Sequence, residues 1–359
     1  MDLNVVDEVR RRLDEALKRQ GVVNIVIAGR TGVGKSTLVN AVFQGNLATT
    51  GQGRPVTTCA TEYTKADLPV LILDTRGLEM DRFAETAKLL EVAVRDRATD
   101  TNATRHLHVA WVCFSEDSRR VEAGETAVVE MLARYMPVIA VVTKARADRG
   151  FRAEVQRLLP AARNVVPVRA LREVDDEGHV LEPRGLVDLV NLTQELVPEA
   201  QRNAFAAAQR ISIELKRNRA QAAVVTSASL AAAAGASPIP FSDAMVIVPI
   251  QIGMLATITA IFGLKLSEGF LSTLLASASG SLAATFVGQA IVSGLLKLVP
   301  GPGTIAGGAI SAATAASLTS VLGGVYVAVL TRLFRRNGSE TPTEQEVTDA
   351  FREELRSVR

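Results

Sequence analysis

Cysteine is scarce in this sequence. Cys59 and Cys113 are the only two cysteines in 359 residues, and neither has another Cys or a His beside it at metal-ligand spacing. This spacing does not favour a metal site built on either cysteine, and we expect both to be buried thiols of a cytosolic protein. The first twenty residues carry charges throughout and lack the apolar run of a signal peptide, so we expect no secretion signal.

The sequence also lacks an excess of charge of either sign. It has 40 Lys and Arg against 38 Asp and Glu, a net charge of +2, whereas a nucleic-acid surface gathers Lys and Arg on one face. We therefore expect no nucleic-acid partner. Between Gln221 and Thr331 the only charged residues are Asp243, Lys265, Glu268 and Lys297. Length and charge together predict two parts, divided near Arg219.

Apolar runs alternate with helical stretches in the first part. The run 22–28 is short, rich in branched residues and bounded by glycine, which predicts a strand. Further strands are expected at 68–73, 107–114, 138–142 and 165–168. Helices are expected at 37–43, 82–95, 122–135, 152–159 and 185–196. Strands separated by helices predict an α/β fold with a mostly parallel sheet flanked by helices, whose ligands bind at the carboxyl ends of the strands.

A phosphate-binding motif follows the first strand. Gly29 to Ser36 fits G-x-x-x-x-G-K-[ST], and its glycines let backbone N–H groups turn toward a β-phosphate at a helix N-terminus. Lys35 is expected to bridge the β- and γ-phosphates and Ser36 to ligate Mg²⁺. A glycine turn with a chance Lys-Ser is the alternative. The expected nucleotide contacts here are Gly29, Arg30, Thr31, Gly32, Val33, Gly34, Lys35, Ser36 and Thr37.

Two later segments complete the expected phosphate and magnesium site. Asp74 to Gly77 reads D-x-x-G after a strand, so the Asp74 carboxylate is expected in the magnesium shell and the Gly77 N–H near the γ-phosphate. Residues 49–58 are rich in Gly, Thr and Pro, which predicts a mobile loop. A hydroxyl in this loop could ligate Mg²⁺ only when the γ-phosphate is present, and Thr57 is preferred to Thr58. An ordinary polar loop is the alternative.

In this order the motifs resemble the Era-like (TrmE/Era-type) branch of the translation-factor-related GTPases. The resemblance implies binding of GTP or GDP with Mg²⁺. The family reads guanine with [NT]-K-x-D; Thr143 and Lys144 match, but Arg146 stands where Asp is expected. Asp148 could substitute if the loop bulges by two residues, and Ala170 matches the fifth motif, whose backbone contacts the base. An ATP-using P-loop protein stays open because of Arg146.

Leu78 follows D-x-x-G where Ras-like enzymes carry a water-positioning glutamine. A leucine cannot orient the attacking water by a hydrogen bond. The resemblance then implies a GTPase whose site is completed by dimerisation, a partner or a bound cation, and we expect slow hydrolysis, with a homodimer through the G domain as one route. Arg30, Gln52 and Arg54 could supply charge or water contacts, or be solvated loop residues.

The second part is apolar. Segments 244–264, 270–296 and 303–331 carry no charge over about the 20 residues of a membrane helix. Positive residues flank them on both sides, which favours a membrane with both ends on the cytoplasmic face, the bacterial inner membrane being the expected one. A soluble cytoplasmic domain of small, closely packed residues is the alternative. The flanking residues are Lys216, Arg217, Arg219, Arg332, Arg335 and Arg336.

Residues 237–243, 248–251 and 299–303 resemble a bacterial domain typified by YcjF, often fused to an Era-like G domain. The layout is also similar, more weakly, to the immunity-related GTPases. The expected division is an amphipathic helix at 1–20, a G domain at 21–197, a linker helix at 198–220, an apolar helical domain at 221–336 and a polar tail at 337–359. The first helix and the tail are expected to pack on the G domain. Two functions stay open: nucleotide control of a membrane-associated domain, and a soluble switch that recruits a protein partner.

Overall fold

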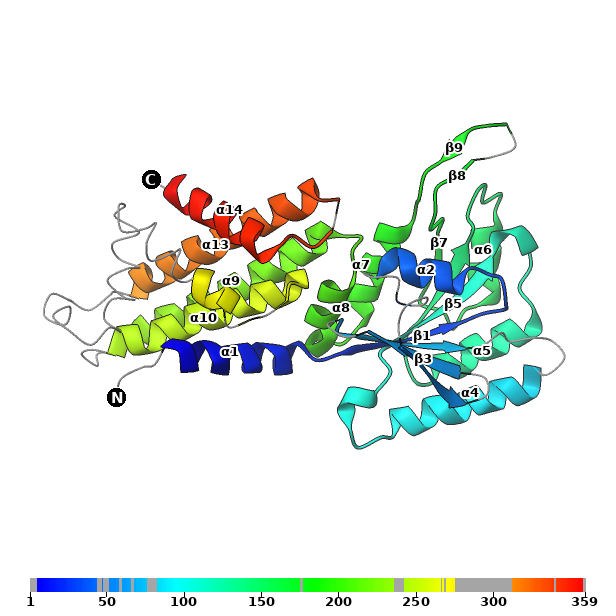
Figure 1. Ribbon diagram of the computed structural model, residues 1–359. Helices are drawn as coiled ribbons and strands as arrows, with labels where there is room; N and C mark the ends of the chain where they lie inside the picture. Colours follow the sequence, from blue (N-terminus) through cyan, green and yellow to red (C-terminus); the bar gives the residue numbers. More distant parts are fainter. Residues whose placement is uncertain are drawn as a thin grey trace, which may run out of the picture. The chain divides into compact units, whose positions relative to one another are not determined.

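The computed structural model describes residues 5–43, 47, 52–57, 60–65, 68–75, 83–174, 177–235, 242–265, 267, 269–274, 312–338 and 340–357. The chain forms two compact units (Figure 1). One unit is Gly21–Ser212; the other combines Met1–Gln20 with Ile213–Arg359. The division at Ser212 precedes the fall in charge near Arg219 by a few residues.

The first unit is built on a seven-stranded sheet in the order β2-β3-β4-β1-β5-β6-β7. Strands β4, β1, β5, β6 and β7 run parallel, while β3 pairs antiparallel with both β4 and β2. All side chains of β1 and β6 are buried, as expected for strands covered on both faces. The strands are β1 (Val23–Ala28), β2 (Gln52–Thr57), β3 (Ala60–Thr64), β4 (Val70–Thr75), β5 (Val109–Ser115), β6 (Val138–Thr143) and β7 (Asn164–Pro167).

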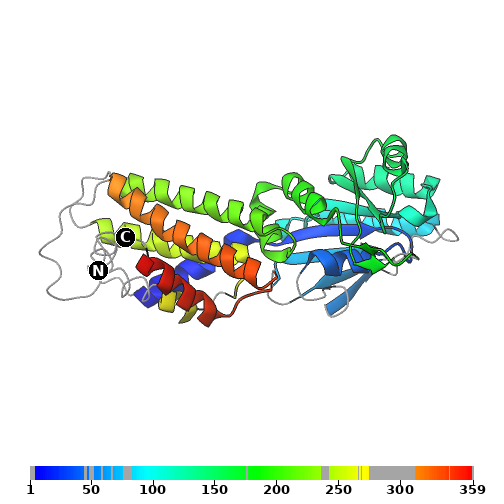
Figure 2. The same ribbon diagram turned by 90° about the horizontal axis from the view of Figure 1, so that it is seen from above.

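Helices cover both faces of this sheet (Figures 1 and 2). One layer packs side chains of α4, α5 and α6 on Val26 and Val112. On the other face Trp111 of β5 donates its indole N–H to Thr193 of α7 (3.1 Å) and stacks on Phe43, which follows α2. The helices are α2 (Lys35–Val42), α4 (Phe83–Ala98), α5 (Ala123–Ala133), α6 (Phe151–Leu158), α7 (Leu186–Leu196) and α8 (Arg202–Ala208). The predicted α/β class, a mostly parallel sheet with flanking helices, is confirmed.

Strands β2 and β3 and one short hairpin were not predicted from the sequence. Residues 52–57, expected as a mobile loop, form strand β2, which pairs with β3. Gly53 and Pro55 signal a loop locally, but β2 is the edge strand, where a proline costs no interior ladder hydrogen bond. A short hairpin of β8 (Glu173–Val174) and β9 (Val180–Leu181) was not predicted. Single 3-10 turns lie at Ala103–Arg105, Glu116–Ser118 and Glu199–Gln201.

The linker helix expected at 198–220 is broken. Helix α8 ends at Ala208, and the next helix begins at Ile213. Between them the Gln209 side chain accepts from Ser212 N (2.7 Å) and donates to Ser212 O (2.9 Å), while Arg210 N donates to Val42 O (2.9 Å). This extended segment completes backbone hydrogen bonds at the end of α2. The first half of the expected linker is therefore part of the first unit.

The second unit is helical. Helix α9 packs along α10 and α13, α10 packs on α1, and α13 packs on α14. A β-carbon on Gly323 of α13 would lie 2.6 Å from Val224 Cγ2 and 2.8 Å from Met254 Sδ, so this glycine permits a close approach of three helices. The helices are α1 (Val5–Gln20), α9 (Ile213–Gly235), α10 (Ser242–Phe262), α13 (Ala312–Arg336) and α14 (Glu344–Ser357).

The amphipathic helices α1 and α14 cover the apolar helices of the second unit. Gln20 Nε2 of α1 donates to Ala260 O (2.9 Å), and Phe351 of α14 meets Tyr326 with ring centroids 5.2 Å apart. Arg332 pairs with Glu354 at 2.7 Å. The expectation that both would pack on the G domain was wrong, because their apolar stripes bury against α10 and α13.

Apolar side chains of α10 lie inside this unit. Ile252, Leu255 and Ile258 are buried, and Thr259 shares a 2.9 Å hydrogen bond with Tyr326. Among the described helices one, Ala313–Arg336, has the length and composition to cross a membrane, with a hydropathy of 1.7 and half of its apolar window buried. A core helix has the same properties, so this is weak evidence for a span. Most of segment 270–296 lies outside the described residues.

Candidate functional site

The loop between β1 and α2 requires glycine at its start. Gly29 has φ +141°, and a β-carbon there would lie 2.5 Å from the Cys113 carbonyl oxygen of β5. Gly32 and Gly34 also have positive φ, at +80° and +97°. These conformations are costly for other residues. The glycines therefore let the loop turn closely over the carboxyl ends of β1 and β5.

Lys35, the first residue of α2, reaches back across this loop. Its Nζ donates to Gly29 O (2.8 Å) and Arg30 O (3.0 Å). The first N–H groups of a helix have no partner within the helix, and the macrodipole places positive partial charge there. An ammonium group and a helix N-terminus thus meet at one place, which is the chemistry of a phosphate-binding site. Ser36 and Thr37 are exposed on the same first turn.

Asp74 lies beside the phosphate loop. It is near the carboxyl end of β4 and pairs in register with Ile27, two residues before Gly29. Buried Cys113 lies within electrostatic reach of both Lys35 and Asp74, and burial raises the pKa of its thiol to about 12. This buried thiol therefore stays protonated at neutral pH. Its electrostatic interactions with Lys35 and Asp74 place these two predicted site residues at the same end of the sheet. Cys59 lies outside the described residues.

The other predicted switch residues are only partly placed. Thr57 is the last residue of β2, and its backbone pairs with Ala60 of β3. Thr58, Gly77 and Leu78 lie outside the described residues. The assignment of Thr57 as a magnesium ligand, and of Gly77 as a contact to the γ-phosphate, stays a prediction.

The base side of the site begins at Thr143, the last residue of β6. Its Oγ1 lies 2.6 Å from Val33 O and 3.0 Å from Phe114 O, so its proton can be donated to either carbonyl. Thr143 thus connects the phosphate loop to the neighbouring strands. Lys144 has a left-handed φ of +53°, and its Nζ lies 3.7 Å from the Asp117 carboxylate.

Asp148 lies two residues before Gly150, the N-cap residue of α6. Its Oδ1 accepts a hydrogen bond from Arg152 N (2.7 Å), and its carbonyl oxygen accepts from Arg119 Nη1 (2.6 Å). The loop before it is held by the buried Glu116, whose Oε2 accepts from the backbone N–H groups of Arg146 and Ala147. The Asp148 carboxylate therefore caps α6 in this structure, and its role in reading a base stays a prediction.

A cavity of about 160 Å³ joins the phosphate loop to the base loop. It brings together Gly34 and Thr37 with Thr143, Lys144 and Ala170, as the sequence predicted for a nucleotide. It also holds Glu173, which was not among the predicted site residues. The sequence feature that could have indicated Glu173 is its position three residues after Ala170, the residue matched to the fifth motif. The remaining lining residues are Leu38, Val168 and Leu171.

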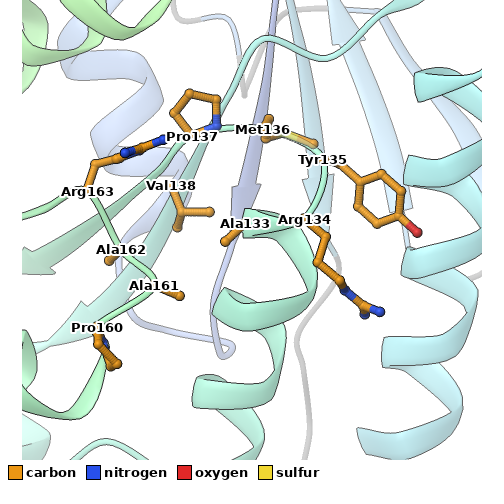
Figure 3. A pocket seen from close by; sticks show the side chains of 10 residues that line it. All are labelled: Ala133, Arg134, Tyr135, Met136, Pro137, Val138, Pro160, Ala161, Ala162 and Arg163. Carbon is orange, nitrogen blue, oxygen red and sulfur yellow. The ribbon is translucent and has the colours of Figure 1, made fainter.

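A larger cavity of about 460 Å³ lies at the amino ends of β6 and β7 (Figure 3). Figure 3 shows the side chains of Arg134 and Tyr135 extending away from Pro160. Arg134 pairs with Glu91 at 3.0 Å. Because ligands of such sheets bind at the carboxyl ends of the strands, the chemistry favours the smaller cavity as the functional one.

Two families match parts of this chain. A model described as "50S ribosome-binding GTPase" matches residues 24–144, and one described as "Domain of unknown function (DUF697)" matches residues 200–357. The first match spans the phosphate loop, Asp74 and the Thr143-Lys144 pair. It supports a GTP-binding G domain here. Neither description names the Era-like branch or a YcjF-like domain, and those finer resemblances stay predictions.

Curated relatives match over short regions. The chain is 31% identical over 98 residues to Ribosome biogenesis GTPase A of Bacillus pumilus (strain SAFR-032), covering 26% of this chain and 34% of the relative. It is 30% identical over 97 residues to Magnetosome membrane protein 22 of Magnetospirillum gryphiswaldense, covering 27% and 50%. The chain thus spans only 34% to 50% of the length of these relatives.

A solved structure, described as a probable GTP-binding protein engB, is 17% identical to this chain. The alignment covers 48% of this chain and 98% of that one, with a TM-score of 0.35. A score that low adds nothing to the assignment of the fold, which stands on the strand order and the family match.

Proposed function

We propose that this chain binds GTP with Mg²⁺ and hydrolyses it slowly to GDP and phosphate. The observation that carries the proposal is the meeting of Lys35 with the N-terminus of α2, beside a cavity that holds Thr143, Lys144 and Ala170. The match of residues 24–144 to a GTPase family supports guanine nucleotide over other phosphate ligands.

Each group at the site has a proposed role. Backbone N–H groups from Gly29 to Thr37 surround the phosphates, and Lys35 neutralises the charge that develops on the γ-phosphate. Ser36, Thr57 and Asp74 supply the oxygen ligands that Mg²⁺ prefers. The residue set fits the ion, since two hydroxyls and one carboxylate leave positions for water and phosphate oxygens.

Hydrolysis is proposed to be slow because Leu78 cannot orient the water that attacks the γ-phosphate. A second copy of the G domain, a protein partner or a bound cation would then complete the site. Of the cations that the sequence offers, Arg30 pairs with Glu122 at 2.6 Å. This ion pair neutralises the Arg30 guanidinium, so the Arg30 side chain is not the cation proposed to complete the site.

Nucleotide titration of the purified chain tests this proposal. We expect the Kd for Mg·GTP to be at least roughly tenfold lower than that for Mg·ATP, a difference of about 1.4 kcal/mol. Turnover by dilute protein should be far slower than that of an activated GTPase, and a rise in turnover per chain with concentration would support dimerisation. Equal affinity for ATP, or fast turnover by dilute monomer, contradicts the proposal.

We further propose that the helical unit associates with the cytoplasmic face of a membrane and responds to the bound nucleotide. Support comes from the length and hydropathy of Ala313–Arg336, from the arginines at its end, and from one relative that is named a membrane protein. The soluble alternative, a switch that recruits a protein partner, is favoured by the buried apolar side chains of α10.

Cell fractionation separates these two functions. We expect the full chain in the membrane fraction, retained after a high-salt wash and released by detergent, because apolar burial in lipid does not depend on salt. Recovery wholly in the soluble fraction without detergent would remove the membrane function and leave the soluble switch.

A further inference from the structure

Glu173 places a carboxylate in the wall of the nucleotide cavity. It is the first residue of β8, its side chain is 28% exposed, and it lines the cavity together with Lys144 and Ala170. These two neighbours are the positions at which the sequence predicts contacts to a base. The cavity thus has a negative group on its base side that no motif assigned.

Arg146 holds this carboxylate. Its Nε lies 3.1 Å and its Nη2 3.0 Å from Glu173 Oε2. Arg146 occupies the position where the resemblance led us to expect an aspartate. The base loop therefore carries no acid at that position, and instead fixes an acid that comes from the hairpin.

The surrounding backbone is rigidly connected. Buried Glu116 accepts from the N–H groups of Arg146 and Ala147. The buried Arg169 guanidinium donates to Ala145 O (3.1 Å) and to Glu182 O (2.8 Å), which connects the base loop to the residue that directly follows β9. These bonds hold the loop that carries Arg146, and Glu173 pairs with Leu181 in the β8–β9 hairpin, so both backbones that position the carboxylate are hydrogen-bonded.

The chemistry of a carboxylate at this place discriminates between purines. Guanine presents two adjacent donors, N1–H and the 2-amino group, and one carboxylate can accept from both. Adenine presents an acceptor at N1 and a C–H at position 2, so the carboxylate would be buried against it without a donor. A carboxylate in this wall therefore favours guanine.

We infer that Glu173, held by Arg146, is the carboxylate that reads the guanine base in this chain. The inference rests on the proposed binding of GTP and assigns its specificity to a residue outside the base loop. Asp148, the candidate from the sequence, instead caps α6.

The test is Glu173→Gln in the full chain, with Kd values measured for the Mg²⁺ complexes of GTP, ATP and xanthosine triphosphate. We expect GTP affinity to fall by about 10- to 100-fold, the scale of lost charge-assisted hydrogen bonds, with ATP affinity within about twofold. Xanthosine triphosphate should bind more tightly than to the wild type, because a glutamine amide donates to the xanthine O2 and accepts from N1–H. A misfolded variant cannot gain affinity in this way.

Two control variants show whether the effect is specific to Glu173. Glu182→Gln makes the same chemical change beside the hairpin, where the side chain is exposed and pairs with Arg172 at 3.2 Å, and should leave all three Kd values unchanged. The second control is Asp148→Asn. If this variant, and not Glu173→Gln, binds GTP more weakly and xanthosine triphosphate more tightly than the wild type, then Asp148 recognises the guanine base and the inference fails. If the wild type prefers GTP to ATP and Glu173→Gln leaves the Kd values unchanged, the inference about Glu173 is wrong but the proposed function stands. If the wild type binds GTP and ATP equally, the proposed function is wrong as well.

Discussion

Lys35→Ala is expected to weaken Mg·GTP binding by roughly 100-fold or more. A hydrogen bond to a charged group contributes about 1.5–3 kcal/mol, and this lysine is expected to contact two phosphates. Each ~1.4 kcal/mol of lost binding free energy raises the Kd by a factor of ten. Its present partners are the carbonyl oxygens of Gly29, which is buried, and of Arg30, which is partly buried, and its removal leaves the backbone hydrogen bonds of β1 and α2 in place. The fold should therefore survive, and titration with a fluorescent GTP analogue measures the loss.

Arg30→Ala is the matched control for this prediction. It removes a cation from the same loop, but that cation pairs with Glu122 at 2.6 Å and is 36% exposed. We expect less than about a threefold change in the Kd for Mg·GTP, as for an exposed ion pair. A thermal melt of each variant shows whether the G unit is folded. Wild-type affinity in folded Lys35→Ala would contradict the assignment of the phosphate site.

Lys216→Met is expected to stabilise the helical unit near neutral pH and to remove a pH dependence of its stability. Lys216 of α9 is fully buried, with Nζ 3.3 Å from Phe262 O at the end of α10 and 5.9 Å from the ring centroid of Phe334. Burial lowers the pKa of its ammonium group from 10.5 to about 7. The charged form is therefore disfavoured in the folded unit.

The direction follows from proton counting. Between pH 7 and 10.5 the unfolded chain keeps the Lys216 proton that the folded unit has released, so the free energy of unfolding rises with pH across this window. The limiting slope is about 1.4 kcal/mol per pH unit, and below pH 7 the full penalty of a few kcal/mol is present. Methionine keeps the length and apolar character without a charge, which removes the slope.

Urea unfolding of the full chain at intervals from pH 6.5 to 9.5 measures both effects. Arg217→Met is the control on the same helix, since this side chain is 49% exposed and pairs with Glu214. It should keep the wild-type slope. Equal slopes in the wild type and in Lys216→Met would show that the buried lysine does not lose its proton in this range.

The parts of the fold that sequence predicts are those set by local pattern. The apolar run before Gly29, the glycines of the loop and the helix after Lys35 are neighbours in the chain, and together they place the phosphate site. Strand β2 was missed because Gly53 and Pro55 oppose a strand locally, while its pairing with β3 and the order of the sheet are tertiary facts.

The base site was less predictable for a similar reason. Asp148 is the first acid after Lys144 along the chain, whereas the acid that lines the cavity belongs to the β8–β9 hairpin and forms an ion pair with Arg146. Sequence spacing gives no measure of that contact. Hydropathy also left α10 open between lipid and protein, because the same apolar side chains suit either surrounding.

The division of the chain has a consequence for its synthesis. Helix α1 belongs to the helical unit, yet its Gln20 bonds to Ala260, 240 residues later. At about 5–20 residues per second, that partner emerges from the ribosome roughly 10–50 seconds after α1. Residues 21–212 can fold in the interval, while the apolar stripe of α1 has nothing of its own unit to cover it. We therefore expect the apolar stripe of α1 to stay exposed to solvent until α10 has been synthesised.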